Sequence, residues 1–266
     1  SEYLPLKKSG RNFKALCPFH SEKTPSFLIS PERQIFKCFG CSVGGDIFGF
    51  LMKMEGMEFG EALRTLAKRA GVTLTTYHPT TAETEKEKLY QINHLASEFY
   101  HYLLASHPVG QQARQYLKLK RGVSEETIRL FKLGYAPPLW EGLQKFLVGK
   151  KGYKPEELLR AGLIVGQTGR FRDFFRDRLI FPLKDHRGNV VGFSGRILNG
   201  DGPKYINTPE TLVYHKAELL YGLETTKNAI KSQNQVIVVE GEFDLLSSWQ
   251  AGVLNVVAIK GSALTE

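Results

Sequence analysis

The sequence predicts an α+β protein, with a small metal-bound β-ribbon and its helices first, a mixed α/β basic region next, and a βαβ unit last. Three observations support this fold class. Every cysteine of the 266-residue chain lies between positions 17 and 41. A basic central stretch has the pattern of a β-hairpin preceded by helices, and residues 235–259 follow a strand, helix, strand pattern. The length allows more than one domain, and 42% hydrophobic residues are enough for a core.

Three cysteines and one histidine form two closely spaced pairs. Two residues separate Cys17 from His20, two separate Cys38 from Cys41, and seventeen lie between the pairs. Each tight turn can therefore supply two ligands to a tetrahedral Zn²⁺ site that leaves no position for water. The odd number of cysteines argues against a disulfide framework. The spacing predicts one structural zinc ion.

Short segments of β-like composition surround these ligands, and Pro25 and Pro31 act as breakers, which is typical of a zinc ribbon. The expected strands are residues 12–15, 26–30 and 33–37. After Gly44 and Gly45, which we expect to end the ribbon, Asp46 is expected to cap an apolar helix running to about Met54. A second helix is expected to stop at Gly71.

Basic and aromatic residues alternate in this ribbon, a pattern found in proteins that bind single-stranded nucleic acid. They are Lys23, Arg33 and Lys37 with Phe27, Phe36 and Phe39. Two interpretations stay open for the aromatic residues. They can stack on bases, or Phe27 and Phe36 can fill the core of the small ribbon.

The polar stretch from Thr75 to Lys88 has almost no apolar residues, so we expect a linker there. Beyond it the sequence predicts helices at 90–104, 111–120, 124–131 and 139–147. Apolar strands at 178–184 and 189–196 flank the turn formed by residues 185–188, which predicts a β-hairpin.

Charge is distributed unevenly along the chain. The net charge of +9 includes +10 over residues 111–235 and −3 over 236–266. A basic region next to an acidic one suits a polyanion bound near carboxylates, as in Mg²⁺-dependent enzymes that act on nucleic acids, although a generic basic surface is the alternative. Arg178, Arg196 and Lys204 lie at strand ends or beside Gly and Pro, where the backbone lets a phosphate approach.

The end of the chain predicts one βαβ unit, with a buried strand at 235–239, a helix at 245–250 and a strand at 255–259. Groups at the carboxyl ends of such strands face the ligand crevice. Glu240 is therefore expected at a site, with Asp244 one helical turn further on. The alternative is that Glu240 caps a helix or forms an ion pair.

Three blocks of the sequence resemble bacterial DnaG-type DNA primases. The first is Leu-Cys-Pro-Phe-His-Ser-Glu-Lys-Thr-Pro-Ser-Phe at 16–27 with Cys-Phe-Gly-Cys at 38–41 and Gly-Asp at 45–46. The second comprises Arg-Leu-Ile-Phe-Pro-Leu at 178–183, Gly-Phe-Ser-Gly-Arg at 192–196, Pro-Lys-Tyr-Ile-Asn-Thr-Pro-Glu at 203–210 and residues 216–222. The third, Val-Glu-Gly-Glu-Phe-Asp at 239–244, is similar to the start of the Toprim fold.

This resemblance implies template-directed synthesis of short RNA primers from ribonucleoside triphosphates on single-stranded DNA. It implies a zinc-binding domain at 1–76, a linker at 77–88, the basic subdomain of the RNA polymerase core at 89–234 and the start of Toprim at 235–266. Toprim carboxylates of the family hold Mg²⁺ or Mn²⁺, so Glu240 would be the first acid and general base or metal-site partner, with Asp244 beside it.

The resemblance also implies roles for the basic residues and a set of partners. The residues that would hold template or nucleotide are Arg178, Arg196, Lys204, Tyr205, Asn207 and Lys216. Lys23, Arg33 and Lys37 would contact the template from the ribbon. Further implied partners are the RNA primer and a replicative helicase bound through a C-terminal domain. With no visible secretory signal or apolar span, we expect no membrane partner and a cytoplasmic location at the replication fork.

The sequence departs from the family pattern in two ways. Glu242 stands where the family usually has tyrosine, which adds a negative charge that can alter nucleotide contacts or metal affinity. The family's paired Asp-x-Asp would lie some tens of residues beyond Asp244, so we expect these 266 residues to bind Zn²⁺ and nucleic acid without completing the catalytic metal site. Alternatives are the primase part of a primase-helicase, a non-catalytic single-strand-binding zinc ribbon, and a Toprim nuclease or topoisomerase.

Overall fold

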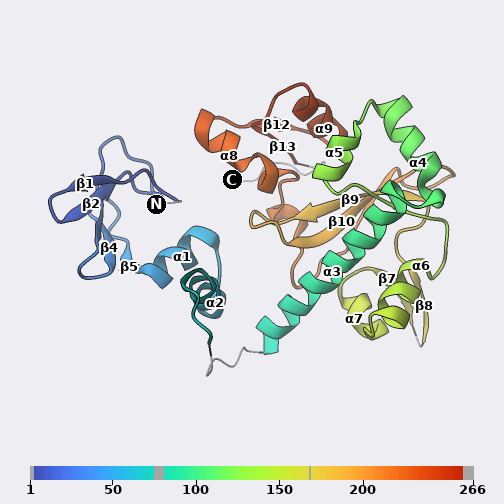
Figure 1. The fold of residues 1–266 in the computed structure, drawn as a ribbon, viewed down its shortest axis with the longest axis horizontal. Helices are drawn as coiled ribbons and strands as arrows, with labels where there is room; N and C mark the ends of the chain where they lie inside the picture. Colours follow the sequence, from blue (N-terminus) through green and yellow to red (C-terminus); the bar gives the residue numbers. More distant parts are fainter. Residues whose placement is uncertain (1–2, 75–80, 168, 260–266) are drawn as a thin grey trace. The chain divides into compact units, whose positions relative to one another are not determined.

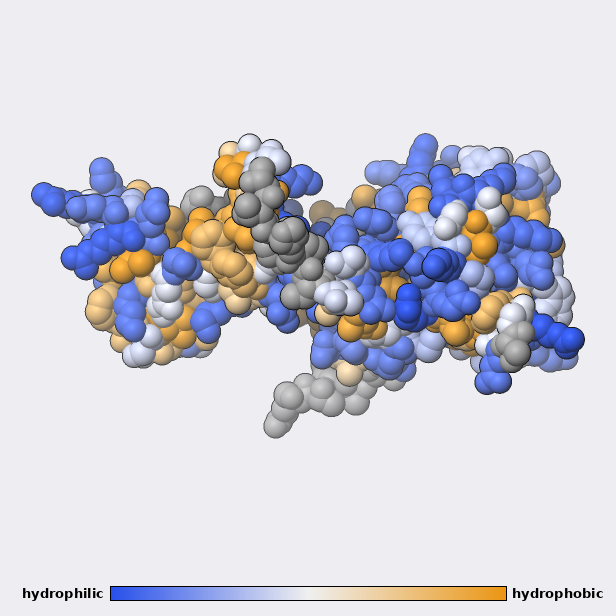
Figure 2. Space-filling model, turned by 90° about the horizontal axis from the view of Figure 1, so that it is seen from below, coloured by the Kyte–Doolittle hydropathy of each residue, from blue (hydrophilic) through white to orange (hydrophobic). Residues whose placement is uncertain are grey.

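The structure is a computed structural model that describes residues 3–74, 81–167 and 169–259 (Figure 1). The chain divides into two compact units, Ser1–Thr84 and Glu85–Glu266. Within the described residues, no helix is both long enough and apolar enough to cross a membrane. Figure 2 shows patches of hydrophobic residues on the surface of unit 1, whereas the face of unit 2 seen there is mostly hydrophilic.

The division between Thr84 and Glu85 falls inside the linker expected at 77–88, and part of that expected range is helical. Residues 75–80 lie outside the described part, and residues 81–88 already belong to α3 (Thr81–Ala105). Glu and Lys are good helix formers, which explains why this polar stretch is helical. Within unit 2, ion pairs of Glu85 with Arg160 and of Lys88 with Glu157 join this part of α3 to α7 (Pro155–Arg160).

Unit 1 is a five-stranded antiparallel sheet in the order β1-β2-β3-β4-β5, followed by two helices. Its strands are β1 (Lys7–Ser9), β2 (Asn12–Ala15), β3 (Phe27–Ser30), β4 (Ile35–Cys38) and β5 (Gly44–Asp46). Its helices are α1 (Ile47–Glu55) and α2 (Phe59–Ala70). The predicted ribbon is confirmed, and Gly44 to Asp46, which were expected to end it, form its last strand.

Both helices of unit 1 begin or end as predicted. The Asp46 carboxylate accepts a hydrogen bond of 2.8 Å from the Gly49 amide, which caps α1. Gly71 ends α2 with φ of +66°, a conformation that glycine adopts without a steric penalty. The Phe27 and Phe36 rings stack 5.1 Å apart in the core of the sheet, so the core interpretation is right for these two residues. Phe39 is 71% exposed.

Unit 2 is built around an antiparallel sheet in the order β11-β10-β9-β6. Its strands are β6 (Gly134–Ala136), β9 (Arg178–Lys184), β10 (Val190–Ile197) and β11 (Tyr205–Asn207). The hairpin β9-β10 is confirmed, with Gly188 in its turn at φ of +96°. Alternate residues of β9 enter two hydrophobic clusters on opposite faces of the sheet, which explains its nearly continuous apolar sequence.

Helices cover this sheet. The long helix α3 packs against it, since the buried Asn93 side chain donates to the carbonyl of Val191 at 3.0 Å. The helical segments between α3 and the final βαβ unit are η1 (Pro108–Gly110), α4 (Gln111–Gln115) continuing into π-helical η2 (Tyr116–Lys120), α5 (Glu125–Leu130), α6 (Gly142–Gln144) continuing into π-helical η3 (Lys145–Lys150), α7 (Pro155–Arg160), 3-10 helix η4 (Lys216–Glu218) and α8 (Leu223–Gln233). A small hairpin joins β7 (Ile164–Gln167) to β8 (Arg170–Asp173).

The predicted βαβ unit is confirmed at the end of the described chain. Strands β12 (Ile237–Val239) and β13 (Val256–Ala258) are parallel and flank α9 (Glu242–Gln250). The expectation that residues 235–239 are buried is wrong: Ile237 is 39% exposed and Val238 42%. In the described residues β12 pairs with β13 alone, whereas β13 also bonds to Tyr221 and is fully buried.

Candidate metal centre and basic pocket

The four predicted metal ligands converge in unit 1. The ligand atoms of Cys17, His20, Cys38 and Cys41 all lie within 4.8 Å of one another. The Sγ atoms of Cys17 and Cys41 are 3.8 Å apart, as are Cys38 Sγ and His20 Nδ1. Two thiolates about 2.3 Å from a tetrahedral Zn²⁺ would themselves lie about 3.8 Å apart. The residues present therefore fit Zn²⁺.

Glu22 fixes the orientation of the histidine ligand. One of its carboxylate oxygens accepts from the amides of Cys17 at 2.7 Å and Ser26 at 3.0 Å. The other lies 3.3 Å from His20 Nε2, which leaves Nδ1 facing the metal position. Hydrogen bonding from Ser26 lowers the pKa of Glu22.

The surroundings shift the pKa values of two cysteine ligands in opposite directions, and burial raises that of Cys17 to about 11. Burial opposes ionisation of Cys38, but hydrogen bonds from Ser26 and from the amides of Cys41 and Gly40 outweigh it and lower its pKa to about 6. At position 40 only glycine fits beside the histidine ring, since a Cβ there would lie 2.6 Å from His20 Nε2.

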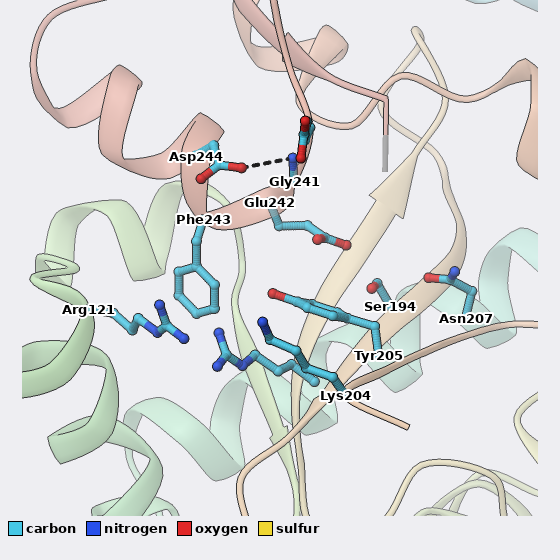
Figure 3. A pocket seen from close by; sticks show the side chains of 11 residues that line it. Arg121, Ser194, Lys204, Tyr205, Asn207, Gly241, Glu242, Phe243 and Asp244 are labelled. Atoms are coloured by element: carbon cyan, nitrogen blue, oxygen red, sulfur yellow. Dashed lines mark hydrogen bonds between the residues drawn. The ribbon is translucent and has the colours of Figure 1, made fainter. Parts of the chain in front are cut away.

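A second site is a pocket of about 390 Å³ in unit 2 (Figure 3). Strand pleating and register build one wall, because Ser194 pairs directly with Asn207 and Arg196 with Tyr205 on one face of β10 and β11. The start of α9 forms the other wall. The lining residues are Arg121, Ser194, Arg196, Lys204, Tyr205, Asn207, Glu240, Gly241, Glu242, Phe243 and Asp244.

Aromatic rings hold the two arginines of this pocket. The guanidinium carbons of Arg121 and Arg196 lie 4.7 and 5.1 Å from the centre of the Phe243 ring. Both arginines also lie 5.5 Å from the Tyr116 ring, and Arg121 Nε donates to the Tyr116 hydroxyl at 2.9 Å. Each contact of this kind contributes about 0.5–1 kcal/mol near a surface. The cations are thus oriented before any anion binds.

The two predicted acids lie on the other side of the pocket. Glu240 directly follows β12 and is exposed, and Asp244 accepts from the Gly241 amide at 3.1 Å in the first turn of α9. In the described part of the chain, the zinc ligands are the only group of three or more His, Cys, Asp or Glu side chains that converge on one point. Glu240 and Asp244 therefore do not form a three-ligand metal site here with other described residues.

Six residues predicted for catalysis or nucleotide binding line this pocket together: Arg196, Lys204, Tyr205, Asn207, Glu240 and Asp244. Two others do not line it. Arg178 is buried and donates from Nη1 to the carbonyls of Gly195 and Pro203, both at 3.0 Å, so it supports the segment before Lys204. It pairs with Ile197, which places it on the opposite face of the sheet from Arg196.

Lys216 is the second predicted residue that does not line the pocket. It is exposed in η4, and its backbone amide donates to Glu210 at 2.9 Å.

The predicted basic residues of unit 1 are all exposed. Arg33 and Lys37 line a cavity of about 360 Å³ with Arg11 and Phe39. Lys23 lies in the segment before β3. Two further lysines that were not predicted, Lys7 and Lys14, share a cross-strand row with Leu28 and Lys37, and alternation along the strands could have indicated them.

Four more residues were not predicted from the sequence: Arg121, Ser194 and Phe243 in the pocket and Glu22 at the metal centre. Ser194 could have been found two residues before Arg196 on the same strand face. Glu22 could have been found two residues after a ligand. For Arg121, which lies in a helical region far from the strands along the chain, no local signal exists.

Comparison with known protein families covers most of the chain. Residues 1–82 match the CHC2 zinc finger, and residues 99–227 match the N-terminal domain of the DNA primase catalytic core. The first match contains the Cys17, His20, Cys38 and Cys41 set, which supports Zn²⁺ at this centre. The second contains the strand wall of the pocket.

Curated proteins and solved structures agree with these matches. The chain is 45% identical to the DNA primase of Deinococcus radiodurans over 99% of its own length and 45% of that protein. It is 43% identical to the zinc-binding and RNA polymerase domains of the Aquifex aeolicus primase, with a TM-score of 0.62 over 99% of this chain and 63% of that one. A DnaG catalytic domain solved with single-stranded DNA is 40% identical, with a TM-score of 0.61 over 68% of this chain and 56% of that one. The chain spans less than half the length of these curated relatives.

Proposed function

Because this chain belongs to the DnaG-type DNA primase family, we propose that it supplies the zinc-binding domain and the basic part of the active site for RNA primer synthesis on single-stranded DNA. The observation that carries this proposal is the pocket of unit 2. It combines Arg121, Arg196 and Lys204 with two acids at the carboxyl end of a parallel strand. Such a pocket suits triphosphates held beside a carboxylate site.

The proposed roles follow from the side-chain chemistry. Lys204 and the two stacked arginines bind phosphate oxygens of the nucleotide or template, and Phe243 limits their movement. Tyr205 and Asn207 line the same wall and contact sugar or base. Glu240, exposed at the end of β12, accepts the proton of the primer 3′-hydroxyl or joins a metal site with Asp244. When bound, Mg²⁺ or Mn²⁺ would neutralise phosphate charge there.

Unit 1 has the features of a single-strand-binding surface. Lys14 and Lys37 flank Leu28 in one cross-strand row, and the exposed Phe39 lines the same cavity as Lys37. Cations of this kind neutralise phosphates, and exposed aromatic rings stack on bases. We propose that this surface, with Lys23 and Arg33, contacts the DNA template. A replicative helicase and the RNA primer are further proposed partners, at the replication fork.

The decisive experiment measures incorporation of labelled ribonucleotides on single-stranded DNA with Mg²⁺. Three proteins are compared: this chain, a form extended to the length of the relatives, and the extended form carrying Glu240→Gln. We expect short RNA from the extended form alone, with at least a hundred-fold loss in the variant. Glu156→Gln, at an exposed position on α7, is the matched control and keeps full activity.

A second candidate function is a non-catalytic module that binds single-stranded DNA. The cross-strand row of Lys14, Leu28 and Lys37 in unit 1 supports this candidate. The candidate predicts that the extended form binds DNA in a salt-sensitive way but incorporates no ribonucleotide. That result would refute the primase proposal.

A further inference from the structure

Glu242 brings a buried carboxylate into the basic pocket. It is the first residue of α9, is 4% exposed and lines the cavity between the strand wall and the two acids. The roles proposed above for Glu240 and Asp244 do not require it. A buried carboxylate that lines a cavity of this size is in a position to accept hydrogen bonds from a ligand that enters the cavity.

The Glu242 side chain points toward the strand wall. In Figure 3 its carboxylate lies on the side of Tyr205, Ser194 and Asn207, away from the Asp244 carboxylate. Burial raises the pKa of the Tyr205 phenol, and the negative charge of Glu242 raises it further. The carboxylate therefore belongs to the polar part of the pocket.

Ser194 provides a second, independent observation. Its side chain is fully buried and lines the same cavity, and no hydrogen-bond partner for its hydroxyl exists among the described residues. A buried hydroxyl without a partner costs about 1–3 kcal/mol. A ligand that supplies a polar group at this point would remove that cost.

Two other ligand types fit Glu242 less well. A metal ion would need further ligands, but Glu240, Glu242 and Asp244 do not converge on one point in the described structure. A phosphate would be repelled by the carboxylate, whereas Arg121, Arg196 and Lys204 offer it three cations elsewhere in the pocket. What remains is a neutral group that donates hydrogen bonds, and carboxylates commonly accept them from ribose hydroxyls.

We propose that Glu242 and Ser194 bind the 2′-hydroxyl of a ribonucleotide whose phosphates lie on Arg121, Arg196 and Lys204, and so select ribonucleotides over deoxyribonucleotides. This inference rests on the proposed function, because it requires a nucleotide in this pocket. The carboxylate accepts a hydrogen bond from the 2′-hydroxyl, and the Ser194 hydroxyl donates one to the 2′-oxygen. Glu242 is thus a specificity-determining residue, distinct from the catalytic acids.

The test measures affinities of the chain for ATP and 2′-deoxy-ATP by calorimetry in the same Mg²⁺ and salt. We expect ATP to bind on the order of ten-fold more tightly, as for a hydrogen bond to a charged group. Glu242→Gln and Ser194→Ala each weaken ATP binding while leaving 2′-deoxy-ATP unchanged or tighter. Glu156→Gln is the matched control and alters neither affinity.

The outcomes separate the inference from the proposed function. Lys204→Ala should weaken both nucleotides equally, and failure of the unmodified chain to bind either one would refute nucleotide binding altogether. Equal affinity for both nucleotides, or equal losses in Glu242→Gln, would refute the inference alone. The inference would also be refuted if Glu242→Gln, in the absence of nucleotide, bound Mn²⁺ more weakly than the unmodified chain does, as measured by electron paramagnetic resonance. If Glu242→Gln does not fold, as judged by its thermal unfolding, Ser194→Ala carries the same test.

Discussion

Substitution of Glu22 by glutamine should weaken zinc binding without removing any ligand. The carboxylate of Glu22 accepts at both oxygens: one faces the Cys17 and Ser26 amides at 2.7 and 3.0 Å, and the other faces His20 Nε2 at 3.3 Å. Glutamine has a single acceptor oxygen. Whichever way its amide is turned, an N–H group of the glutamine faces either the backbone amides or the histidine ring.

The magnitude follows from the interactions lost. One hydrogen bond to a charged group contributes about 1.5–3 kcal/mol, which corresponds to about a 10- to 150-fold change in a binding constant. Loss of a carboxylate partner from a metal-bound histidine typically costs about 10- to 100-fold in metal affinity. The two estimates overlap, so we expect Glu22→Gln to lower Zn²⁺ affinity by about 10- to 100-fold.

The assay is competition for zinc between the protein and a coloured chelator, followed by absorbance. Glu32→Gln is the matched control, because Glu32 is exposed in the turn between β3 and β4 of the same unit. We expect its affinity to equal that of the unmodified chain. An affinity of Glu22→Gln within two-fold of the control would refute the reasoning, since the carboxylate would then not hold His20 in place.

Three further predictions concern unit 2. Arg121→Ala should weaken single-stranded DNA binding about ten-fold and reduce its salt slope by about one, measured by fluorescence anisotropy, whereas Lys145→Ala, on the exposed surface, should have little effect. Gly195→Ala should lower the free energy of unfolding by about 1–3 kcal/mol in urea, because its Cβ would lie 2.5 Å from the Phe175 ring, whereas Gly149→Ala, with open space around it, should not. Burial raises the pKa of Asp173 from 3.8 to about 6, so the folded state holds the Asp173 proton more tightly than the unfolded state does. The resulting contribution to the free energy of unfolding is complete below about pH 4 and is lost as pH rises through 6. The loss amounts to about 2–3 kcal/mol, and Asp173→Asn should abolish this pH dependence of stability. The measurement is urea unfolding followed by tryptophan fluorescence between pH 4 and 7.

Features encoded by neighbouring residues were predictable from the sequence. The metal centre follows from two pairs of ligands, each two residues apart, and its four ligands do converge. The β9-β10 hairpin follows from two apolar runs around a turn containing Gly188, and the βαβ unit from a strand pattern broken by Gly241. In each case the contacts that form the structure join residues close together in the sequence. Hydrophobic periodicity and turn residues in the sequence therefore predict them.

Features that depend on register were not predictable in the same way. Arg178 and Arg196 look equivalent in the sequence, because each is a basic residue at a strand end. The pairing of Arg178 with Ile197 and of Arg196 with Leu179 puts their side chains on opposite faces of the sheet. One therefore binds two carbonyls in the interior, and the other lines the pocket.

The sequence by itself determined the zinc ligands, the β9-β10 hairpin and the βαβ unit, and its resemblance to a known family indicated six residues of the pocket. Only the tertiary structure brought Arg121 against Phe243 and set Ser194 and Glu242 on the same cavity. The physical reason is that a binding pocket forms where segments far apart in the sequence meet. Pleat, register and helix packing decide which side chains reach that point, and no single segment encodes all three.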